Sequence, residues 1–455
     1  MEPPATTEHD VTVGEAMRMA LAFQQRGQLD DALQVYRRIM EVAPDHPDIV
    51  HFYGVLLHQL GRSEEAIATI ERSLELEPDR AECYNNLGII FRALERYDEA
   101  VAAYTRATEV DPHHANAYNN LGVLRRFTGK PAEAEGAYRK AIELNPGYAE
   151  AYHNLGVLLT GQKRPREAIL CYFKVLSLEP ARTDDRRLLA IAYCEIGERD
   201  KAIEIFEKWI AEDPESPVAR HMLAAVSGRD VPVRASDAYL ELSFDGFAES
   251  FERKLEQLSY RAPSLVAAAI KESGLEAAGQ LDVLDAGCGT GLCGPLVKPY
   301  ARRLVGVDLS VGMLGKAQQK QVYDQLVKNE LTQFLLMRPG EFDLILSADT
   351  LVYFGALDQV AAAAAGALRP GGLLVFTVEE FVDPPAGVPY RIETHGRYSH
   401  TQSYVEDVLR QSGFTPDIAH ADLRTESALP VAGLVVRATK WNGLRRWRPP
   451  LKLPN

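Results

Sequence analysis

The chain has 455 residues, of which 46% are hydrophobic and 25% are charged, and its formal net charge at pH 7 is -14. This length predicts at least two domains, and the negative charge excludes nucleic acid as a partner for the bulk of the surface because it repels phosphate. No stretch reaches the roughly 18 uncharged apolar residues of a membrane helix, and residues 1–17 lack the basic flank and apolar core of a signal peptide. The five cysteines form no CxxC pair. We therefore expect a cytoplasmic protein without a membrane span, a disulfide framework or a metal site.

Prolines recur every 34 residues through the first half of the chain, at Pro44, Pro78, Pro112, Pro146, Pro180 and Pro214. A small residue precedes each proline by twelve positions and a bulky residue precedes it by eight. Glycine follows Tyr53, Leu87, Leu121 and Leu155. Because proline cannot continue a helix, this spacing predicts pairs of helices that end before each proline. The glycines mark where the first helix lets the second approach.

The 34-residue pattern resembles tetratricopeptide repeats over residues 13–216. The resemblance implies an α-solenoid of six repeats with a capping helix, together spanning residues 13–228, after a disordered tail at 1–12. It also implies a groove that binds a protein or an extended peptide. Asn86, Asn120 and Asn154 occupy the position that faces this groove, where an amide offers a peptide main chain both a donor and an acceptor. Asparagine is also common in such repeats without a ligand, and this alternative stays open.

Strand and helix patterns alternate in the second half. Residues 229–280 predict a linker and two helices, which we expect to cover a substrate pocket. Apolar runs at 281–286, 303–308, 341–348 and 372–379 predict parallel strands separated by helices, with a short strand before Glu330. Residues 415–424 and 431–439 predict an antiparallel hairpin. The sequence thus predicts a Rossmann-like α/β domain over residues 281–440, followed by a basic tail at 441–455.

A glycine-rich loop follows the first predicted strand. Gly287, Gly289 and Gly291 permit a tight turn and let a ligand approach backbone N–H groups at a helix N-terminus. Residues 289–294 also fit GxGxxG, which leaves dinucleotide binding as an alternative. Asp285 argues against a pyrophosphate, which its carboxylate would repel, and favours a ligand with an ammonium group.

The segments VLDAGCGTG (283–291) and GVDLSVGML (306–314) resemble the first two motifs of class I methyltransferases. The resemblance extends over nearly the whole chain to bacterial methyltransferases that carry tetratricopeptide repeats. It implies S-adenosylmethionine as the cofactor and a seven-stranded sheet, with Asp308 on the ribose and Glu330 near the adenine amine. Met313 either packs on the adenine or belongs to a helix core. The implied cofactor-binding residues are Asp285, Gly287, Cys288, Gly289, Gly291, Asp308, Met313 and Glu330.

A base for the methyl acceptor is expected beyond the ends of the fourth and fifth strands. The candidate catalytic residues are Asp349, Tyr353 and His400, with His395 as a further candidate and Tyr398 as a pocket wall. Each has a structural alternative, because the aspartate can cap a helix, the tyrosine can be core and the histidines can be solvated.

We interpret the chain as an S-adenosylmethionine-dependent methyltransferase whose repeats recruit a protein or peptide. One alternative keeps the enzyme but gives it a small quinone-like or lipid-precursor acceptor, with the repeats used only for assembly. A non-enzymatic scaffold with a cofactor-sensing domain and an NAD-dependent oxidoreductase are the others. The sequence identifies neither the methyl acceptor nor the atom that is methylated.

Overall fold

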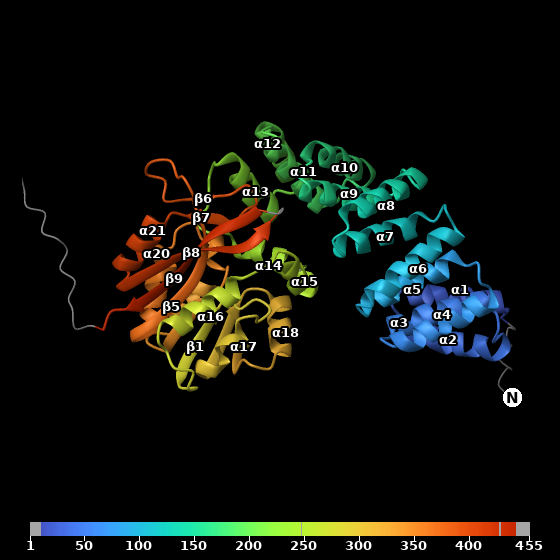
Figure 1. Cartoon of the computed structure of the whole chain (residues 1–455), viewed down its shortest axis with the longest axis horizontal. Helices are drawn as coiled ribbons and strands as arrows, with labels where there is room; N and C mark the ends of the chain where they lie inside the picture. Colours follow the sequence, from blue (N-terminus) through green and yellow to red (C-terminus); the bar gives the residue numbers. More distant parts are fainter. Residues whose placement is uncertain (1–10, 247, 427–428, 443–455) are drawn as a thin grey trace, which may run out of the picture. The chain divides into compact units, whose positions relative to one another are not determined.

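The computed structural model describes residues 11–246, 248–426 and 429–442 (Figure 1). The chain forms two compact units, Met1–Asp185 and Arg186–Asn455. They divide within α11 (Thr183–Glu195) rather than at Gly228, where the repeat array was expected to end. The last predicted repeat and its capping helix therefore belong to the unit that contains the sheet. Most of the two predicted tails, residues 1–10 and 443–455, lies outside the described residues.

Helices of the first unit alternate between 13 and 14 residues in length. They are α1 (Val13–Gln25), α2 (Leu29–Val42), α3 (Pro47–Gln59), α4 (Ser63–Leu76), α5 (Ala81–Ala93), α6 (Tyr97–Val110), α7 (Ala115–Phe127), α8 (Pro131–Leu144), α9 (Ala149–Gly161) and α10 (Pro165–Leu178). Each even-numbered helix ends two residues before a repeat proline, as predicted. Thr12 accepts a hydrogen bond from Glu15 N and caps α1, so it belongs to the first helix rather than to a disordered tail.

The repeat glycines lie where the two helices of one repeat come closest. A β-carbon at Gly88 would lie 2.5 Å from Tyr104 Cε1, and one at Gly122 would lie 2.7 Å from Tyr138 Cδ1. Both tyrosines are fully buried, so their rings cannot move aside without disturbing the core. The predicted close approach is therefore confirmed, and in the four repeats that carry the glycine its partner is the bulky residue of the pattern.

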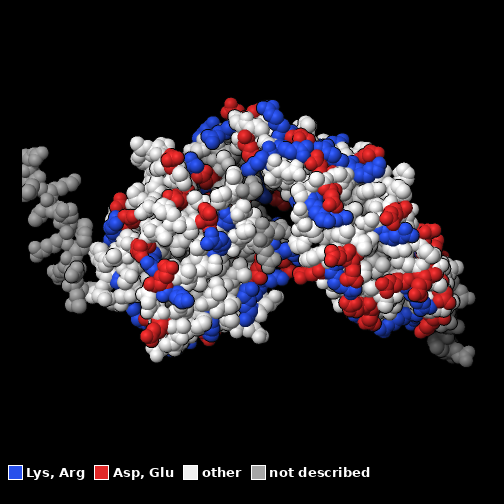
Figure 2. All heavy atoms as spheres, viewed as in Figure 1, with Lys and Arg blue, Asp and Glu red and all other residues white. Residues whose placement is uncertain are grey.

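Charged side chains of both signs lie next to one another on the face of the repeats shown in Figure 2. Some connect the two ends of one turn, as between Arg96 and Glu99 at 2.5 Å, and others connect successive repeats, as between Arg96 and Glu64 at 3.3 Å. Exposed pairs of this kind contribute little stability individually. They keep the surface of the array solvated.

The second unit begins with helices that precede the sheet. After α11 they are α12 (Arg199–Glu212), α13 (Pro217–Ser227), α14 (Asp237–Asp245), η1 (Ala248–Ser250), α15 (Phe251–Gln257) and α16 (Ala262–Glu272). Gly228 ends α13 in the left-handed conformation, as expected for a glycine after a helix. We call residues 237–246 and 248–257 the cap segment.

A single mixed sheet forms the centre of this unit. Its strands are β1 (Leu281–Ala286), β2 (Ala301–Asp308), β3 (Gln325–Lys328), β4 (Phe342–Ser347), β5 (Leu368–Glu380), β6 (Tyr390–Ile392), β7 (Tyr398–His400), β8 (Phe414–Glu426) and β9 (Leu429–Lys440). The order is β3-β2-β1-β4-β5-β7-β6, while β9 pairs antiparallel with β5 and with β8. The predicted parallel strands and C-terminal hairpin are confirmed.

The described residues contain nine strands where seven were expected. The two additional strands arise because the connection after β5 folds back on itself, so that β6 and β7 pair antiparallel. Strand β7 then continues the sheet by pairing parallel with the end of β5, at Glu379 and Ser399. The segment between β5 and α21, in which no strand was predicted, is therefore part of the sheet.

Helices cover both faces of the sheet. They are α17 (Gly294–Val297), α18 (Val311–Gln319), α19 (Leu331–Leu336), α20 (Asp358–Ala367) and α21 (Gln402–Gln411), with short turns η2 (Lys298–Tyr300) and η3 (Leu351–Tyr353). Neighbouring side chains of β1 enter different cores: Leu284 packs with Phe376 in one, and Val283 packs with Val266 of α16 in the other. This alternation is that of a strand buried on both faces.

Within the described part of the chain, no helix is both long and apolar enough to cross a bilayer. The same residues contain no group of three or more His, Cys, Asp or Glu side chains placed to hold a metal ion.

Candidate functional site

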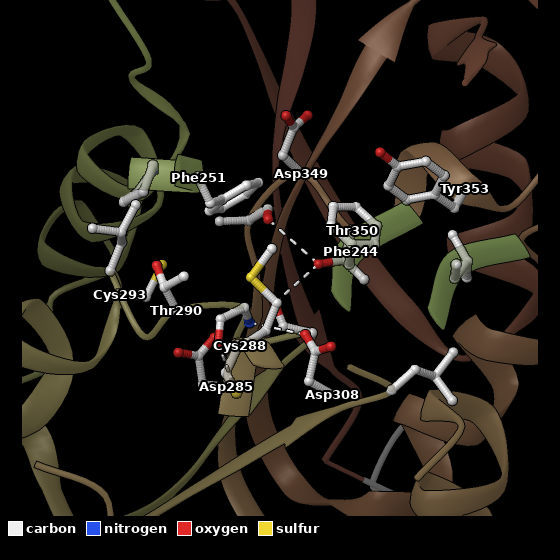
Figure 3. Close-up of a pocket in the computed structure, with 18 of the residues that line it drawn as sticks. Phe244, Phe251, Asp285, Cys288, Thr290, Cys293, Asp308, Asp349, Thr350 and Tyr353 are labelled. Atoms are coloured by element: carbon white, nitrogen blue, oxygen red, sulfur yellow. Dashed lines mark hydrogen bonds between the residues drawn. The ribbon is translucent and has the colours of Figure 1, made fainter. Parts of the chain in front are cut away.

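A cavity of ≈ 250 Å³ lies where the carboxyl ends of β1, β2 and β4 meet (Figure 3). Parallel α/β sheets bind ligands at this edge. The loop after β1 lines one side, and Phe244 and Phe251 of the cap segment line another. The cavity joins the predicted cofactor site to a second region around Asp349 and Tyr353. We call that second region the acceptor half.

Asp285 lies near the end of β1, with 1% of its surface exposed, and faces the cavity. Its Oδ2 accepts a hydrogen bond of 2.6 Å from Tyr323 Oη. Burial raises the pKa of Asp285 to about 7, while the bond from Tyr323 lowers it and the nearby Asp308 raises it. A ligand ammonium group at this position would restore the carboxylate and bind to it.

Tyr323 occupies a slot made by glycines. A β-carbon would lie 2.8 Å from its ring at Gly294, 3.1 Å at Gly306 and 3.0 Å at Gly291. The last glycine of the GxGxxG match therefore makes room for Tyr323 and not for a pyrophosphate. Gly291 does not line the cavity, so its predicted role as a cofactor contact is corrected: it packs on Ala317 and Tyr323. No sequence pattern pointed to Tyr323.

Gly287, Cys288 and Gly289 line the cavity as predicted. Gly287 has φ 74°, and a β-carbon on it would lie 2.3 Å from Thr350, whose Oγ1 donates to Gly287 O at 3.1 Å. Burial raises the pKa of the Cys288 thiol, which stays protonated. The two glycines offer the ligand a bare backbone, and Cys288 adds its thiol to the lining.

Asp308 ends β2 on the other side of Cys288 (Figure 3). Its Oδ2 accepts a hydrogen bond from Gly289 N and its Oδ1 accepts one from Ser310 N, each at 2.9 Å. Burial raises its pKa and these backbone bonds lower it. A carboxylate oxygen has two lone pairs, so each oxygen keeps capacity for a ligand hydroxyl.

Met313 and Glu330 also line the cavity. Met313 is almost fully buried on α18, which agrees with both of its proposed roles. The Glu330 oxygens accept hydrogen bonds from Thr332 N at 3.0 Å and Gln333 N at 2.8 Å, so Glu330 also caps α19. Asn329 lies beside it and was not predicted.

The acceptor half contains Asp349 and Tyr353, as predicted. Asp349 is not available as a free base, because Arg424 Nη1 donates to its Oδ2 at 2.8 Å and to its Oδ1 at 3.1 Å. Burial raises the pKa of Asp349 and Arg424 lowers it. The Tyr353 ring lies edge-on to the Phe244 ring, with 5.5 Å between the two ring centroids. Burial raises the pKa of the Tyr353 phenol, so Tyr353 stays protonated and forms part of the cavity wall.

The prediction of a catalytic role for His400 is wrong. It lies on β7, fully buried, with its Nε2 3.1 Å from Gly355 O, and it does not line the cavity. Burial lowers its pKa to about 4, so it stays neutral. His395 and Tyr398 are also absent from the lining; Tyr398 donates to Pro232 O at 2.6 Å instead.

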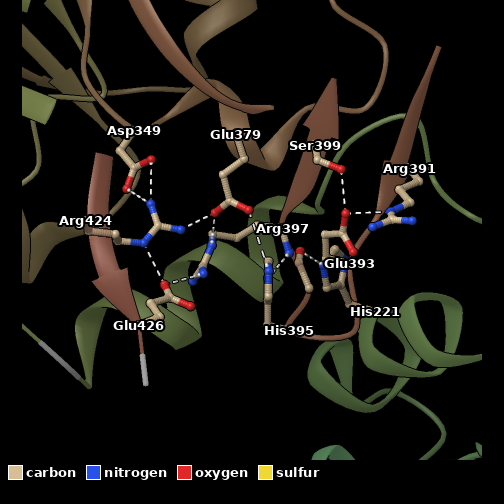
Figure 4. A network of polar contacts seen from close by, with 11 residues as sticks. His221, Asp349, Glu379, Arg391, Glu393, His395, Arg397, Ser399, Arg424 and Glu426 are labelled. Carbon is tan, nitrogen blue, oxygen red and sulfur yellow. Dashed lines mark hydrogen bonds and ion pairs between the residues drawn. The ribbon is translucent and has the colours of Figure 1, made fainter. Parts of the chain in front are cut away.

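A buried ion network borders the acceptor half (Figure 4). Arg424 pairs with Asp349, Glu379 and Glu426, and Arg397 donates to Glu379 and Glu426, each at 2.6 Å. Both arginines line the cavity. The network was missed because its members come from four separate segments without a common spacing.

The predicted asparagine ladder connects successive repeats. Asn120 Nδ2 donates to Asn85 Oδ1 at 2.9 Å and Asn154 Nδ2 donates to Asn119 Oδ1 at 3.0 Å. Asn86 Nδ2 lies 2.9 Å from His51 Nε2 in the same way. One N–H of each of these amides is therefore used in a hydrogen bond between successive repeats.

Comparisons with known proteins agree with both halves of the chain. A family model described as a methyltransferase domain matches residues 284–376. Models of tetratricopeptide repeats match residues 16–46, 49–113, 85–149, 137–169 and 187–218. A solved structure of pilF from Pseudomonas aeruginosa is 20% identical, with a TM-score of 0.41, and covers 47% of this chain and 96% of that one.

Two curated relatives match part of the chain. Methyltransferase-like protein 27 of Homo sapiens is 33% identical over 136 residues, which are 30% of this chain and 55% of that protein. Malonyl-[acyl-carrier protein] O-methyltransferase of Enterobacter lignolyticus (strain SCF1) is 32% identical over 95 residues, which are 21% and 38%. The chain thus matches about half of the first relative's length and less of the second's. The chain carries tetratricopeptide repeats followed by a class I S-adenosylmethionine-dependent methyltransferase domain.

Proposed function

We propose that the protein transfers a methyl group from S-adenosylmethionine to an acceptor bound in the same cavity. The observation that carries this proposal is the position of Asp285 and Asp308. They lie at the ends of adjacent strands and face one cavity, together with the glycine-rich loop that follows β1. This set of groups fits the cofactor, with Asp285 toward the ammonium group and Asp308 toward the ribose hydroxyls.

The bound cofactor supplies the reactive methyl carbon, and the protein supplies position and a water-poor surrounding. Hydrogen bonds to a charged group contribute about 1.5–3 kcal/mol each, so two hydroxyls on Asp308 would account for much of the affinity. Phe244 and Phe251 of the cap segment cover the cavity with apolar surface.

Calorimetry with the full-length protein tests the cofactor assignment. We expect S-adenosylmethionine to bind the wild type and to bind an Asp308→Ala variant at least tenfold more weakly. Unchanged affinity in the variant would remove Asp308 from the site, and tight NADH binding would replace the proposed function with oxidoreduction. Asp324→Ala is a matched control, because Asp324 lies beside β3 and does not line the cavity.

We also propose that the repeat array binds a polypeptide that is the substrate or a localisation signal. The family of the repeats supports this role, and each ladder amide has a second N–H beyond the one used between repeats. The names of the curated relatives do not settle the acceptor: a third relative is an 18S rRNA (guanine-N(7))-methyltransferase of Bos taurus, whereas the Enterobacter lignolyticus protein acts on malonyl-[acyl-carrier protein]. A small acceptor remains the alternative.

Pull-down from extract with full-length protein separates these alternatives. If the ladder holds the polypeptide, changing Asn86, Asn120 and Asn154 together to Ala should abolish its capture. A partner that is retained would show that the ladder only joins repeats. Circular dichroism and cofactor affinity must match the wild type, because the same amides contribute to packing.

A further inference from the structure

We propose that the methyl acceptor presents a carboxylate, that Arg397 binds this carboxylate, and that the product is a methyl ester. This inference rests on the proposed methyltransferase function and names its substrate class. It comes from a guanidinium at the acceptor half whose hydrogen-bonding capacity is only partly used.

Arg397 is fixed on two sides. Its Nε donates to Glu379 Oε1 and its Nη2 donates to Glu426 Oε1, each at 2.6 Å. Within the described residues, Nη1 has no hydrogen-bond partner, although the side chain lines the cavity and keeps 21% of its surface exposed. Both N–H groups of Nη1 and one N–H of Nη2 on a preoriented guanidinium therefore remain for a ligand, and the planar donors of a guanidinium suit a carboxylate.

Arg424 shows the contrast within the same network. Its Nη1 bonds Asp349, its Nη2 bonds Glu379 and its Nε bonds Glu426, so all three nitrogens are used. Its side chain is 3% exposed. Arg424 thus connects the acids of the network, whereas Arg397 retains N–H groups that no described residue of the protein uses.

The backbone beside Arg397 is held in place by the helices before the sheet. Gly396 has φ 90° and fits between Tyr239 Oη and Met222 Sδ, at 3.0 and 3.2 Å from the position of a β-carbon. His221 Nε2 lies 2.7 Å from Gly396 O, and its ring stacks on Tyr239 at 4.0 Å. These contacts orient the segment that delivers Arg397 to the cavity.

Among the described lining residues, the acids that are not assigned to the cofactor are held by arginines, which also fits an acceptor that is already ionised. No histidine is among the described residues that line the cavity, and Asp349 is held by Arg424. Burial raises the pKa of both lining phenols, Tyr260 and Tyr353, so they are donors and not bases. A carboxylate needs no proton removed before it reacts.

The transfer balances without any proton movement. A carboxylate oxygen attacks the methyl carbon of the donor, an O–C bond forms and the C–S bond breaks. The electron pair of the broken bond goes to sulfur. The negative carboxylate and the positive sulfonium become a neutral ester and a neutral thioether, and no oxidant or base is consumed.

Charge at the acceptor half neither repels nor attracts an anion strongly. In the acceptor half, Arg234 pairs with Asp237, and Arg397 and Arg424 pair with Asp349, Glu379 and Glu426. The unused guanidinium donors and the nearby sulfonium therefore select the carboxylate. The apolar side chains of Leu240, Leu255 and Leu258 in the same lining favour an aliphatic or aromatic body behind it.

Methyl esters can be recognised by their lability in alkali. Full-length protein is incubated with extract of its source cells and methyl-tritiated S-adenosylmethionine, and the products are separated into protein and small-molecule fractions. Mild alkali should release the label from one fraction as volatile methanol. The fraction that carries it shows whether the carboxylate belongs to a polypeptide or to a small molecule.

Arg397→Lys keeps the positive charge beside Glu379 and Glu426 but removes the fork of donors. We expect it to reduce base-labile labelling at least tenfold while the calorimetric affinity for S-adenosylmethionine stays within twofold. Arg391→Lys is the matched control, because Arg391 pairs with Glu393 and does not line the cavity. It should label like the wild type.

The possible failures are distinguishable. Label that is transferred but withstands alkali would overturn the carboxylate and leave the methyltransferase proposal intact. Equal labelling by the Arg397→Lys variant would remove Arg397 from acceptor recognition. Failure of the wild type to bind S-adenosylmethionine would instead take away the proposed function itself.

Discussion

Tyr323 Oη donates a hydrogen bond of 2.6 Å to Asp285 Oδ2, although the two residues are 38 positions apart in the chain. The phenol reaches the carboxylate because Gly294 and Gly306 leave room for its ring. Asp285 would otherwise be a buried acid without a neutral donor to support its charge. In the proposed binding mode, Tyr323 therefore positions Asp285 toward the cofactor's ammonium group.

Removing this hydroxyl should weaken cofactor binding and shift its pH dependence. The cofactor's ammonium group needs an ionised Asp285, whose pKa is about 7, so affinity should rise with pH through that region. The bond from Tyr323 lowers this pKa, and Tyr323→Phe should raise it. We expect about tenfold weaker S-adenosylmethionine binding at pH 7, from a hydrogen bond of about 1.5–3 kcal/mol, and a midpoint at higher pH.

Calorimetry at several pH values measures this shift. A merely structural role for Tyr323 would lower affinity equally at every pH, and that result would contradict the positioning role. Tyr300→Phe is a suitable control, because Tyr300 packs on the core beneath α16 without lining the cavity.

Asp285 should make the ligand-free protein less stable as pH rises. Its folded-state pKa of about 7 lies above the ordinary value, so the folded protein favours the protonated acid. Stability from this group is present below pH 4 and is lost as pH rises from about 4 to about 7, on the order of 1–4 kcal/mol. Asp285→Asn should therefore raise the thermal midpoint of the ligand-free protein at pH 8 and weaken cofactor binding.

Differential scanning calorimetry at pH 5 and pH 8 checks this sign. The gain from Asp285→Asn should be larger at pH 8, where the wild-type carboxylate is forced to ionise without a ligand. A lower thermal midpoint in the Asp285→Asn variant at pH 8 would show that neighbouring groups already stabilise the ionised carboxylate in the ligand-free protein.

Arg424 should be indispensable to the stability of the second unit. It is the shared partner of Asp349, Glu379 and Glu426, and its side chain is 3% exposed. Removing one member of a buried ion network leaves uncompensated charge and costs about 3–5 kcal/mol. Arg424→Gln should lower the thermal midpoint by several degrees, as measured by circular dichroism.

Arg410→Gln provides the comparison, because Arg410 pairs with Glu406 on the exposed surface of α21. A surface pair of this kind contributes about 0–1 kcal/mol, so the midpoint should hardly move. Similar midpoints in both variants would mean that the network does not depend on Arg424.

The repeat array was the most predictable part of the molecule, because its information is local and repeated. Each of the six repeat prolines follows the end of a helix, and the glycine of four repeats meets the bulky residue sixteen positions later, as Gly88 meets Tyr104. Because the pattern occurs six times, a departure from it in one repeat does not obscure the prediction. The ladder amides were harder, since a sequence cannot show that Asn120 bonds to Asn85 in the preceding repeat.

In the cavity, the predictable residues were those at the ends of strands. Asp285 and Asp308 follow apolar runs, and parallel strands bring their ends to one edge. His400 was misplaced because its short strand has no apolar pattern of its own and pairs only with segments already in the sheet. Arg397 and Tyr323 reach the site through tertiary packing, to which spacing along the chain gives no clue.

Ion pairs hold the cap segment beside the cofactor end of the cavity. Glu249 pairs with Lys316 at 2.6 Å and Glu252 pairs with Lys320 at 2.9 Å. Asp245 Oδ1 also accepts a hydrogen bond from Gly312 N at 3.1 Å. Phe244 and Phe251 of this segment line the cavity, so we expect cofactor exchange to depend on the opening of these contacts.

Reversing the two lysines should therefore accelerate cofactor release. Lys316→Glu with Lys320→Glu replaces two attractions by repulsions, and exposed pairs contribute about 0–1 kcal/mol each, so we expect a severalfold faster dissociation in stopped-flow measurements. Higher ionic strength should speed release from the wild type, because salt screens exposed charges. Adding Glu249→Lys and Glu252→Lys to the double variant restores opposite charges and should restore slow release. If release stays fast after this exchange, the lysines act through the packing of α18 and not through their charge.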